Sequence, residues 1–294
     1  MKIGTFSNEY QKKEVIQNIF DMLGESNSEV YVQKEFCSQI SKFIGLEGKI
    51  TGIIDTEKPL PALDIALSIG GDGTFLRTVS FLRGTTIPIL GINTGRLGFL
   101  ADISADDTEE TLAEILEGSY QVEKRTQIKL TVENSDKEYY ALNEAAILKQ
   151  DSASMITVTM YINDEILSSY EADGLIIATP TGSTAYSLSV GGAIIAPDTP
   201  NFIITAIAPH SLTSRPLVVA DTNVLTMEVS SRTSSFLVSV DGRSEAFPVN
   251  GSVLRIEKAD MPVYVVKRIG HTFYATIRNK LKWGTDPRQE NGNN

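Results

Sequence analysis

The first part of the chain alternates short apolar runs with segments in which apolar residues recur every three to four positions. The apolar runs predict buried strands of a parallel sheet, and the periodic segments predict helices packed against it. Strands are expected at 3–6, 30–32, 63–69 and 87–92, and helices at 8–23, 36–44, 75–82 and 108–116. This alternation predicts an α/β domain with a Rossmann-like parallel sheet over residues 1–124.

From about Gln127 the apolar residues alternate with polar ones instead. A period of two predicts strands with one buried face. Such strands are expected at 128–132, 139–148, 156–162, 175–178, 202–206, 217–219, 224–229, 236–240, 253–256 and 263–266, with hairpin turns at Asn163-Asp164, Asp241-Gly242 and Asn250-Gly251. Residues 125–294 are therefore expected to form a mostly β domain.

The end of the chain breaks this β pattern. A last helix is expected at 276–283, and about the last 25 residues are a candidate to pack back onto the first domain. Residues 286–294 are polar and lack an apolar anchor, which predicts a flexible tail.

Composition and charge narrow the possible functions. With 294 residues the chain is long enough for two domains, and its formal charge of −11 argues against nucleic acid or an anionic membrane as partner. A small phosphate ligand stays compatible, because helix ends and local cations can hold it in an acidic protein. One cysteine and two histidines provide neither a disulfide framework nor a typical zinc site. Without a spanning apolar run, a cytoplasmic protein is expected.

The segment 70–74 (Gly-Gly-Asp-Gly-Thr) lies where a predicted strand becomes a predicted helix. Its glycines can adopt positive φ and let backbone N–H groups approach an anion, which the helix dipole also favours. Asp72 would repel a phosphate unless a divalent cation bridges the two or the carboxylate takes a proton from an attacking hydroxyl. The alternative is that Asp72 only caps the helix.

Two further segments carry polar residues in unusual places. Residues 91–100 contain several glycines after a predicted parallel strand. This segment is expected to form either a second wall of the same cleft or a simple turn with Phe99 packed inward. Asn143 and Glu144 lie in an otherwise apolar predicted strand, so one of them is expected to be buried and to need a partner. An amide suits a base edge and a carboxylate suits a ribose diol, whereas an exposed strand end would need neither.

The segment 173–192 joins a buried strand to a Pro-Thr-Gly-Ser-Thr turn and a short run of hydroxylated residues. Such a turn offers backbone and hydroxyl donors, and Tyr186 can stack on a planar ring, so the segment suits a nucleotide. A serine nucleophile is disfavoured, because His210 and His271 are remote in sequence and no Gly-x-Ser-x-Gly motif surrounds the serine.

Together, segments 70–74, 93–100, 142–144 and 173–192 resemble the NAD kinase family, and Pro209-His210 through Arg215-Pro216-Leu217 is also similar to it. The glycine-aspartate turn alone is shared with diacylglycerol-type lipid kinases and phosphofructokinases, whereas the segment 173–192 is specific. The resemblance implies an NAD kinase/diacylglycerol kinase-like fold of two domains. It also implies phosphorylation of NAD at the 2′-hydroxyl of its adenosine ribose, which gives NADP.

The resemblance also implies roles for individual residues. Asp72 would contact the 2′-hydroxyl and act as general base, Gly73 would supply a backbone contact, and Arg77, one helical turn on, would lie near the phosphates. Asn143 and Glu144 would hold a ribose and base. Asp173 would bind the amide group of the nucleotide, and the dinucleotide pocket would be lined by Thr181, Thr184, Ala185, Tyr186, Ser187, Leu188, Ser189 and Ala208. No residue is assigned as a metal ligand.

The same resemblance implies ATP as donor, with polyphosphate as an alternative, a divalent cation such as Mg²⁺, and a homodimer or homotetramer. Glu171 departs from the family, because several bacterial members carry Arg there, which leaves the choice between NAD and NADH open. Two other functions remain: a lipid kinase, which the acidic charge and the lack of a basic amphipathic helix disfavour, and a non-catalytic NAD sensor, which the intact Asp72 disfavours.

Overall fold

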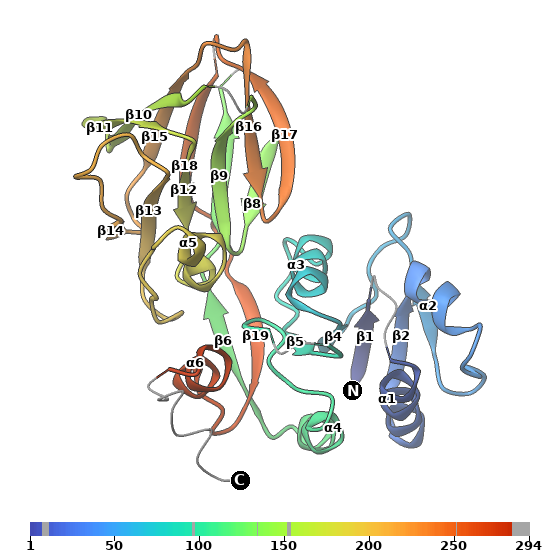
Figure 1. Ribbon diagram of the computed structural model, residues 1–294. Coiled ribbons are helices and arrows are strands. Elements are labelled where there is room, and N and C mark those ends of the chain that lie inside the picture. Colours follow the sequence, from blue (N-terminus) through green and yellow to red (C-terminus); the bar gives the residue numbers. More distant parts are fainter. Residues whose placement is uncertain (8–11, 96–97, 134, 152–153, 251, 284–294) are drawn as a thin grey trace. The chain divides into compact units, whose positions relative to one another are not determined.

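The computed structural model describes residues 1–7, 12–95, 98–133, 135–151, 154–250 and 252–283 (Figure 1). The chain divides into two compact units, Met1–Glu123 with the segment from Tyr264 onward, and Lys124–Val263. The sheet topology makes the first unit α/β and the second unit mostly β, as the sequence predicts. The sequence analysis assigns residues 125–294 to the second domain, with about the last 25 residues as a candidate to pack back onto the first. In the structure the chain rejoins the first unit at Tyr264.

The first unit is built on a seven-stranded sheet of order β3-β2-β1-β4-β5-β19-β6, in which the pairs from β3 to β19 are parallel. Its strands are β1 (Lys2–Phe6), β2 (Glu29–Gln33), β3 (Gly52–Ile54), β4 (Ile65–Ile69), β5 (Ile89–Ile92), β6 (Tyr120–Arg125) and β19 (Val263–Arg268). Its helices are α1 (Lys13–Glu25), α2 (Lys34–Ile40), α3 (Asp72–Phe81), α4 (Thr108–Leu116) and α6 (Phe273–Leu281).

The core of this unit follows from the two periodicities of the sequence. On α1, Ile16, Ile19, Phe20 and Leu23 are buried, which is one helical face, and every residue of β4 is buried because helices cover both sides of a parallel sheet. The carboxyl ends of β4 and β5 lead into the glycine-rich segments of the sequence. Ligands of open α/β sheets bind at such strand ends.

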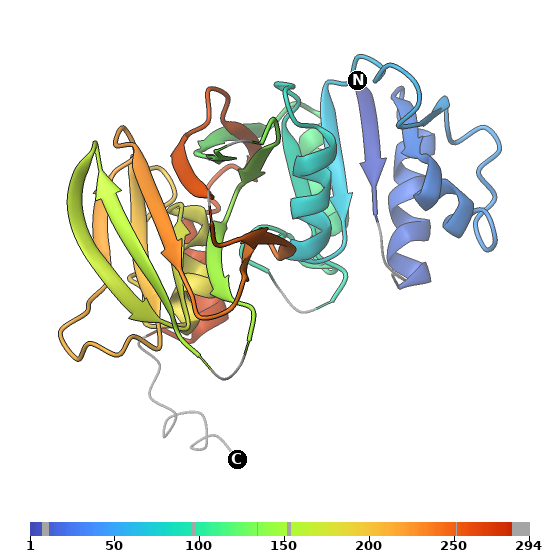
Figure 2. The same ribbon diagram turned by 90° about the horizontal axis from the view of Figure 1, so that it is seen from above.

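The second unit is a sandwich of two six-stranded antiparallel sheets (Figure 2). One sheet has the order β11-β10-β15-β18-β7-β8 and the other β14-β13-β12-β9-β16-β17. The strands are β7 (Ile128–Val132), β8 (Glu138–Ala141), β9 (Glu144–Lys149), β10 (Ile156–Ile162), β11 (Glu165–Ala172), β12 (Gly174–Ala178), β13 (Asn201–Ile207), β14 (Leu217–Ala220), β15 (Leu225–Ser230), β16 (Ser235–Val240), β17 (Arg243–Pro248) and β18 (Val253–Lys258).

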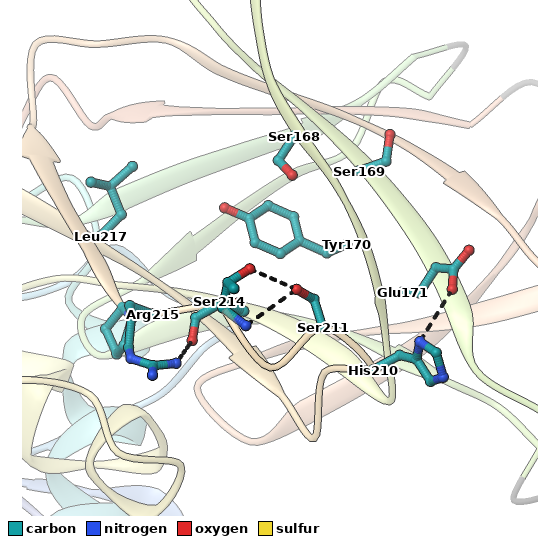
Figure 3. Close-up of a pocket in the computed structure, with 11 residues that line it drawn as sticks. Ser168, Ser169, Tyr170, Glu171, His210, Ser211, Ser214, Arg215 and Leu217 are labelled. Atoms are coloured by element: carbon teal, nitrogen blue, oxygen red, sulfur yellow. Dashed lines mark hydrogen bonds and ion pairs between the residues drawn. The ribbon is translucent and has the colours of Figure 1, made fainter.

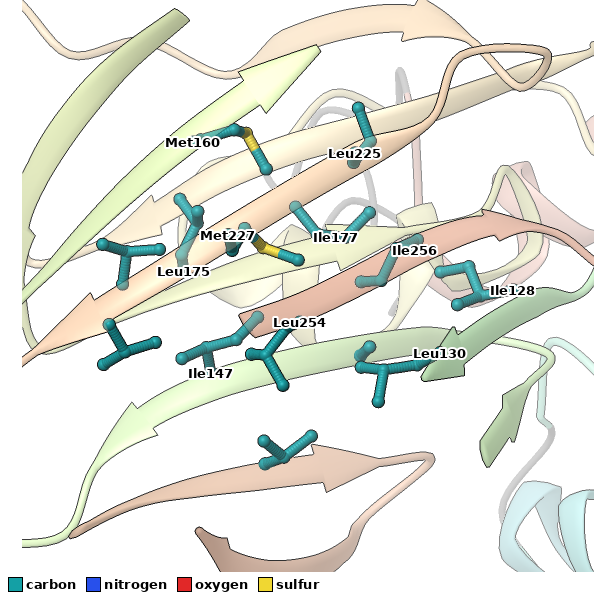
Figure 4. Packing of buried hydrophobic residues seen from close by; sticks show 14 of the residues in the cluster. Ile128, Leu130, Ile147, Met160, Leu175, Ile177, Leu225, Met227, Leu254 and Ile256 are labelled. Carbon is teal, nitrogen blue, oxygen red and sulfur yellow. The ribbon is translucent and has the colours of Figure 1, made fainter. Parts of the chain in front are cut away.

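Side chains from both sheets fill the space between them (Figure 4). Leu130 and Leu254 from one sheet join Ile147 and Ile177 from the other in a single buried cluster. The opposite face of β12 is also covered, since Ile176 packs in a smaller cluster with Ile195. Strand β12 is therefore buried on both faces, which explains its unbroken apolar sequence.

The predicted single strand at 139–148 is wrong. Residues 138–141 form β8 in one sheet and 144–149 form β9 in the other, so the chain crosses between sheets at Leu142 and Asn143. The pattern hid this crossing because Leu142 is buried like a strand residue. The strands β3, β6, β11 and β17 were not predicted, and β11 in particular is an edge strand with mostly exposed residues.

Several predicted boundaries also differ. The helix expected to reach 44 ends at Ile40, α1 continues through Gly24 to Glu25, and the last helix runs from Phe273 to Leu281. The turns Asn163-Asp164 and Asp241-Gly242 are confirmed by positive φ at all four residues. The predicted cap at Asn8, the end of the turn at Gly251 and the tail 286–294 lie outside the described residues. Within the described residues, no helix has the length and apolar character needed to cross a membrane.

Candidate active site

The glycine-aspartate turn connects β4 to α3. After β4 ends at Ile69, Gly70 has φ of 150°, a conformation that side-chain-bearing residues avoid. Gly71 has φ of −86° and forms the N-cap, and α3 begins at Asp72. Of the three glycines, only Gly70 uses positive φ, while Gly73 is exposed in the first helical turn. N–H groups at such a turn lack intrahelical acceptors and favour an anion.

The Asp72 carboxylate does not cap its own helix. It accepts hydrogen bonds from three consecutive backbone N–H groups, those of Phe99, Leu100 and Ala101, each at 3.0 Å. The capping alternative is therefore wrong, and Asp72 instead fixes the segment that follows β5. Gly98 is needed there, because a Cβ on it would overlap the Asp72 carboxylate. Residues 98–101 thus form a wall beside Asp72, while Arg96 and Leu97 of the same motif lie outside the described residues.

A lysine that the sequence analysis missed lies beside Asp72. The Lys280 Nζ of α6 is 3.9 Å from Asp72 Oδ2 and 4.2 Å from the centre of the Phe99 ring. No local motif marks Lys280, since only the tertiary fold brings the end of the chain to this turn. Arg77, one helical turn after Gly73 on α3, is exposed.

Asp102, next to the segment that binds Asp72, is the centre of a buried ionic cluster. Its Oδ2 lies 2.5 Å from Lys267 Nζ and 3.3 Å from His271 Nε2. Burial alone would raise the pKa of Asp102, but the charges and hydrogen bonds of Lys267 and His271 outweigh burial and hold that pKa below its ordinary value. This cluster ties β19 to the segment that carries the donors for Asp72.

In the second unit, Asp241 repeats the arrangement found at Asp72. Its carboxylate accepts from the N–H groups of Leu142, Asn143 and Glu144 at 2.8, 2.9 and 3.2 Å. Asn143 and Glu144 are both buried, at 7% and 8% exposure. The expectation that only one of them is buried is wrong, as is the exposed-strand-end alternative, because the crossing between sheets turns both residues inward.

Glu144 is poised between its two protonation states near neutral pH. Burial, and next the negative charge of Asp241, raise its pKa to about 7, against a smaller lowering by the backbone N–H of Tyr186. Its Oε2 is buried and has no hydrogen-bond partner among the described residues, and the same holds for Oγ1 of Thr181 and of Thr74. Buried polar atoms are nearly always paired in native proteins, so these three atoms are candidates to bind a ligand.

The turn after β12 packs directly on Asn143. Thr179 Oγ1 donates to the Leu142 carbonyl at 2.5 Å and accepts from the N–H of Gly182 at 3.1 Å. A Cβ on Gly182 would overlap the Asn143 carbonyl, so glycine is required there. This packing places Thr181 and the following helical turns, η1 (Thr181–Thr184) and α5 (Tyr186–Ser189), beside Glu144.

Within those helical turns, the side chains differ in exposure. Thr181 and Ser187 are buried, Thr184, Ala185 and Leu188 are partly exposed, and Tyr186 and Ser189 are exposed. The hydroxyl of Ser183 donates to the Ile195 carbonyl and accepts from the Ile195 N–H, which leaves it no role as a nucleophile. Tyr186 is 39% exposed and has a ring face available for stacking.

The structure does not bring Asp173 and Ala208 to Glu144 within this unit. Glu144 pairs with Ala178 at one end of β12, whereas Asp173 and Ala208 adjoin the Gly174–Ile207 pair at the other end. A strand of this length spans roughly 17 Å. Asp173 forms an ion pair with Lys149 at 2.6 Å, and Ala208 has φ of 45°, a strained value for a residue with a side chain.

A cavity of about 530 Å³ lies near that second end, between β11 and the segment that precedes β14 (Figure 3). Hydroxyl groups line much of it, and Tyr170 extends into it. At its edge, Glu171 Oε2 lies 4.0 Å from His210 Nδ1, and the His210 N–H donates to the Glu171 carbonyl at 2.8 Å. The residue that departs from the family pattern is thus next to the histidine of the Pro-His motif.

The α/β unit places a carboxylate at the glycine-rich start of a helix. The β unit places buried polar groups, unpaired among the described residues, at a turn suited to a nucleotide. Together these features define a nucleotide-dependent phosphotransferase. Comparison with known families identifies the family of this phosphotransferase. Residues 5–120 match the ATP-NAD kinase N-terminal domain, and residues 142–268 match the ATP-NAD kinase C-terminal domain. The chain belongs to the NAD kinase family.

Individual relatives agree with this assignment. The chain is 46% identical to the NAD kinase of Bacteroides fragilis and 41% identical to that of Porphyromonas gingivalis, and each alignment covers 98% of this chain and at least 99% of the relative. Among solved structures, it is similar to yeast NADH kinase complexed with NADH, with a TM-score of 0.88 at 25% identity over 97% of this chain and 89% of the other. It is also similar to an NAD kinase from Archaeoglobus fulgidus in complex with ATP, with a TM-score of 0.74 at 26% identity over 96% and 99% of the two chains.

Proposed function

We propose that this protein transfers the γ-phosphoryl group of ATP to the 2′-hydroxyl of the adenosine ribose of NAD, which gives NADP. The observation that carries the proposal is the Asp72 carboxylate, held by three backbone N–H groups at the start of a glycine-flanked helix. Phosphoryl transfer depends mainly on positioning and on charge neutralisation, and a fixed carboxylate can orient the acceptor hydroxyl and receive its proton. The family relationship favours this reaction over lipid phosphorylation.

The first unit supplies the groups that act on the hydroxyl and the phosphates. Asp72 orients the 2′-hydroxyl and serves as the base, Gly73 offers its backbone N–H, and the exposed Arg77 contacts phosphate oxygens. Thr74, whose buried hydroxyl has no partner among the described residues, is a candidate for one more phosphate contact.

The second unit supplies the groups that hold the nucleotide. Asn143 and Glu144 bind a ribose and base, and the unpaired Glu144 Oε2 is suited to accept from a ribose hydroxyl. Tyr186 stacks on a ring of the dinucleotide. The remaining pocket residues of this end are Thr181, Thr184, Ala185, Ser187, Leu188 and Ser189.

A divalent cation, Mg²⁺ or similar, fits the donor atoms present. Among the described residues, no cluster of three or more His, Cys, Asp or Glu side chains could hold a metal ion by itself. Mg²⁺ bound through substrate phosphates needs only one or two carboxylates, and Asp72 Oδ2 accepts a single N–H and so has capacity left. When bound, the cation would neutralise charge on the ATP phosphates.

We further propose that the protein works as a homodimer or homotetramer. Asp173 and Ala208 lie at the end of β12 opposite Glu144, so they would bind the amide group of a dinucleotide held by a neighbouring subunit. Apolar side chains are exposed in the segment that follows Ala208 and at the start of β14, namely Leu212 at 91%, Leu217 at 36% and Val218 at 42%. Patches of this kind mark protein interfaces in soluble proteins.

Three finer proposals follow from the family and the composition. Polyphosphate is an alternative donor to ATP, and a single cysteine supports a reducing, cytoplasmic location. Glu171 would affect the choice between NAD and NADH, because its carboxylate is 62% exposed beside His210 where several family members carry Arg.

The test is an assay of NADP formation with purified protein, Mg²⁺ and either ATP or polyphosphate, with NAD, NADH or dispersed diacylglycerol as acceptor. We expect NADP from NAD and ATP, and a loss of kcat by about 10²- to 10⁴-fold in Asp72→Asn with NAD binding preserved. Asp106→Asn, at an exposed acid of the same unit, is the matched control and should keep normal kcat. Labelled lipid without NADP would support the lipid kinase instead, and tight NAD binding without turnover would support the sensor. Near-normal kcat in Asp72→Asn would show that Asp72 is not the base.

A further inference from the structure

The C-terminal helix α6 brings a positive charge to the Asp72 carboxylate within the first unit. The Lys280 ammonium is 3.9 Å from Asp72 Oδ2, longer than the 2.7–2.9 Å of a tight charge-assisted hydrogen bond. Its separation from the Phe99 ring centre is 4.2 Å, which lies within the range of a cation–π contact. The ammonium is therefore held beside Asp72 by electrostatics, while its donors are not consumed by a short hydrogen bond to that carboxylate.

This placement answers the electrostatic problem that Asp72 creates. A carboxylate that receives a proton from the acceptor hydroxyl repels the phosphoryl group that the same hydroxyl attacks. A lysine ammonium is a compact charge on a flexible stem, so it can move from the Phe99 ring to phosphoryl oxygens over a short distance. The Lys280 side chain is 28% exposed, open enough to reach a ligand and covered enough to act in reduced dielectric.

Lys280 also belongs to the framework that positions Asp72. The ring beneath its ammonium is that of Phe99, whose own N–H donates to Asp72 Oδ2. Two other residues of the same returning segment, Lys267 and His271, hold Asp102 just after the donor residues. The last part of the chain thus contributes both the support for Asp72 and a cation next to it.

We propose that Lys280 is a further catalytic residue, whose ammonium contacts the oxygens of the phosphoryl group as it passes to the acceptor hydroxyl at Asp72. In that step the hydroxyl oxygen forms a bond to the γ-phosphorus, and the bond from this phosphorus to the ADP oxygen breaks with its electron pair. The hydroxyl proton passes to Asp72, and Lys280 stays protonated throughout. The inference rests on the proposed role of Asp72.

The experiment compares Lys280→Met, Lys280→Arg and Arg278→Met in steady-state kinetics and thermal unfolding. Met replaces the lysine with an unbranched apolar side chain whose sulfur can contact the Phe99 ring, so it removes the charge, whereas Arg keeps the charge. Arg278 is an exposed cation on the same helix. We expect Lys280→Met to lower kcat by about 100-fold with little change in the KM for NAD and in Tm. Lys280→Arg should recover at least half of that loss on a logarithmic scale, and Arg278→Met should match the unaltered protein.

Each other outcome overturns the inference in a recognisable way. Near-normal kcat in Lys280→Met, with Asp72→Asn inactive, refutes the role of Lys280 and leaves that of Asp72 intact. Near-normal kcat in both variants refutes the role of Asp72 and this inference with it. An equal loss of kcat in the Met and Arg variants, together with a lower Tm, identifies Lys280 as a packing residue. A decrease in kcat of the same size in Arg278→Met would show that the overall charge of α6, rather than Lys280 itself, is responsible.

Discussion

Asp72 in the first unit and Asp241 in the second use the same local chemistry beside different neighbouring side chains. Each carboxylate accepts from three consecutive backbone N–H groups, 99–101 for Asp72 and 142–144 for Asp241. Lys280 lies next to Asp72, whereas the acid Glu144 lies next to Asp241. In each unit the aspartate and its three N–H donors form what we call a clamp, which lies beside a lysine in the first unit and beside a buried acid with a raised pKa in the second.

This difference matches what we propose that each site binds. A phosphoryl group carries negative charge and needs a cation close to the carboxylate that orients its acceptor. A ribose and base carry no charge, and a buried acid that is half-protonated near neutral pH can donate or accept a hydrogen bond to them. The neighbouring side chain, rather than the aspartate itself, distinguishes the two sites.

The largest effect is expected from the cluster that supports the Asp72 clamp. Lys267→Met leaves the buried Asp102 without its closest cation, which should lower the free energy of unfolding by about 3–5 kcal/mol. The double variant Asp102→Leu/Lys267→Met should recover much of that loss, because an apolar pair replaces the ion pair. Urea unfolding measures both. A single variant as stable as the unaltered protein would show that the clamp needs no ionic support.

The next effect is expected from the second clamp. Asp241→Ala leaves three backbone N–H groups without their acceptor, and we expect the free energy of unfolding to fall by about 3 kcal/mol. Asp241→Asn keeps one acceptor oxygen and should fall by less. The KM for NAD should rise in both, since Asn143 and Glu144 lose their fixed geometry. An unchanged KM in a folded Asp241→Ala protein would separate this clamp from nucleotide binding.

The pH dependence of folding stability distinguishes the acids that lie beside the two clamps, Glu144 and Asp102. The pKa of Glu144 is raised from 4.5 to about 7, so the folded state holds this proton more tightly than the unfolded state. Glu144 therefore stabilises the fold at low pH, and about 2.5 kcal/mol of this contribution should be lost between pH 5 and pH 8. The contribution of Asp102 to stability has the opposite pH dependence. Because its pKa is lowered in the folded state, it stabilises the fold at pH values above its ordinary pKa, and this stabilisation is lost in acid.

Glu144→Gln provides the measurement for that prediction. Unfolding free energies of the variant and the unaltered protein at pH 5 and pH 8 should show a smaller decrease for the variant. Glu138→Gln, at an exposed acid outside this site, is the control and should keep the full decrease. Equal pH dependence in all three proteins would contradict the raised pKa of Glu144.

The smallest effect is expected from the wall beside Asp72. Gly98→Ala places a Cβ against the Asp72 carboxylate, so the segment must shift to relieve the overlap. A shift of this kind should lower kcat by about tenfold, equivalent to 1.4 kcal/mol. Gly95→Ala, at a nearby exposed glycine whose added Cβ would meet Asn93 Oδ1 at an ordinary contact distance of 3.9 Å, is the control. Equal kinetics for the two variants would show that the clamp tolerates movement.

The sequence predicted those elements whose own residues show a clear apolar pattern. Helix α4 has the predicted bounds, and the buried strand β12 was recognised from its continuous apolar run. The crossing at Leu142 was missed, because burial by a second sheet looks the same in sequence as burial within a strand. Polar edge strand β11 was missed because exposed strands carry no hydrophobic period.

The two sites differ in the same way. Asp72 and Asn143-Glu144 stand out locally, as an acid among glycines and as polar residues in an apolar run. Lys280 and Asp241 act at sequence distances that no local pattern records: Lys280 is 208 positions after Asp72, and Asp241 is 97 positions after Glu144. Their roles depend on sheet order and on the return of the chain, which only the three-dimensional structure supplies.

The return of the chain at β19 also sets an order of events during synthesis. Strand β19 lies between β5 and β6 in the first sheet, yet the whole second unit is translated before it. At ~5–20 residues per second, the ribosome needs on the order of ten seconds to make that intervening unit. Until β19 and α6 emerge, the nascent first sheet has a gap, Asp102 lacks Lys267, and Asp72 lacks Lys280. A ribosome-bound chain is therefore expected to complete its β sandwich first, and to start turnover only after translation has reached its final segment.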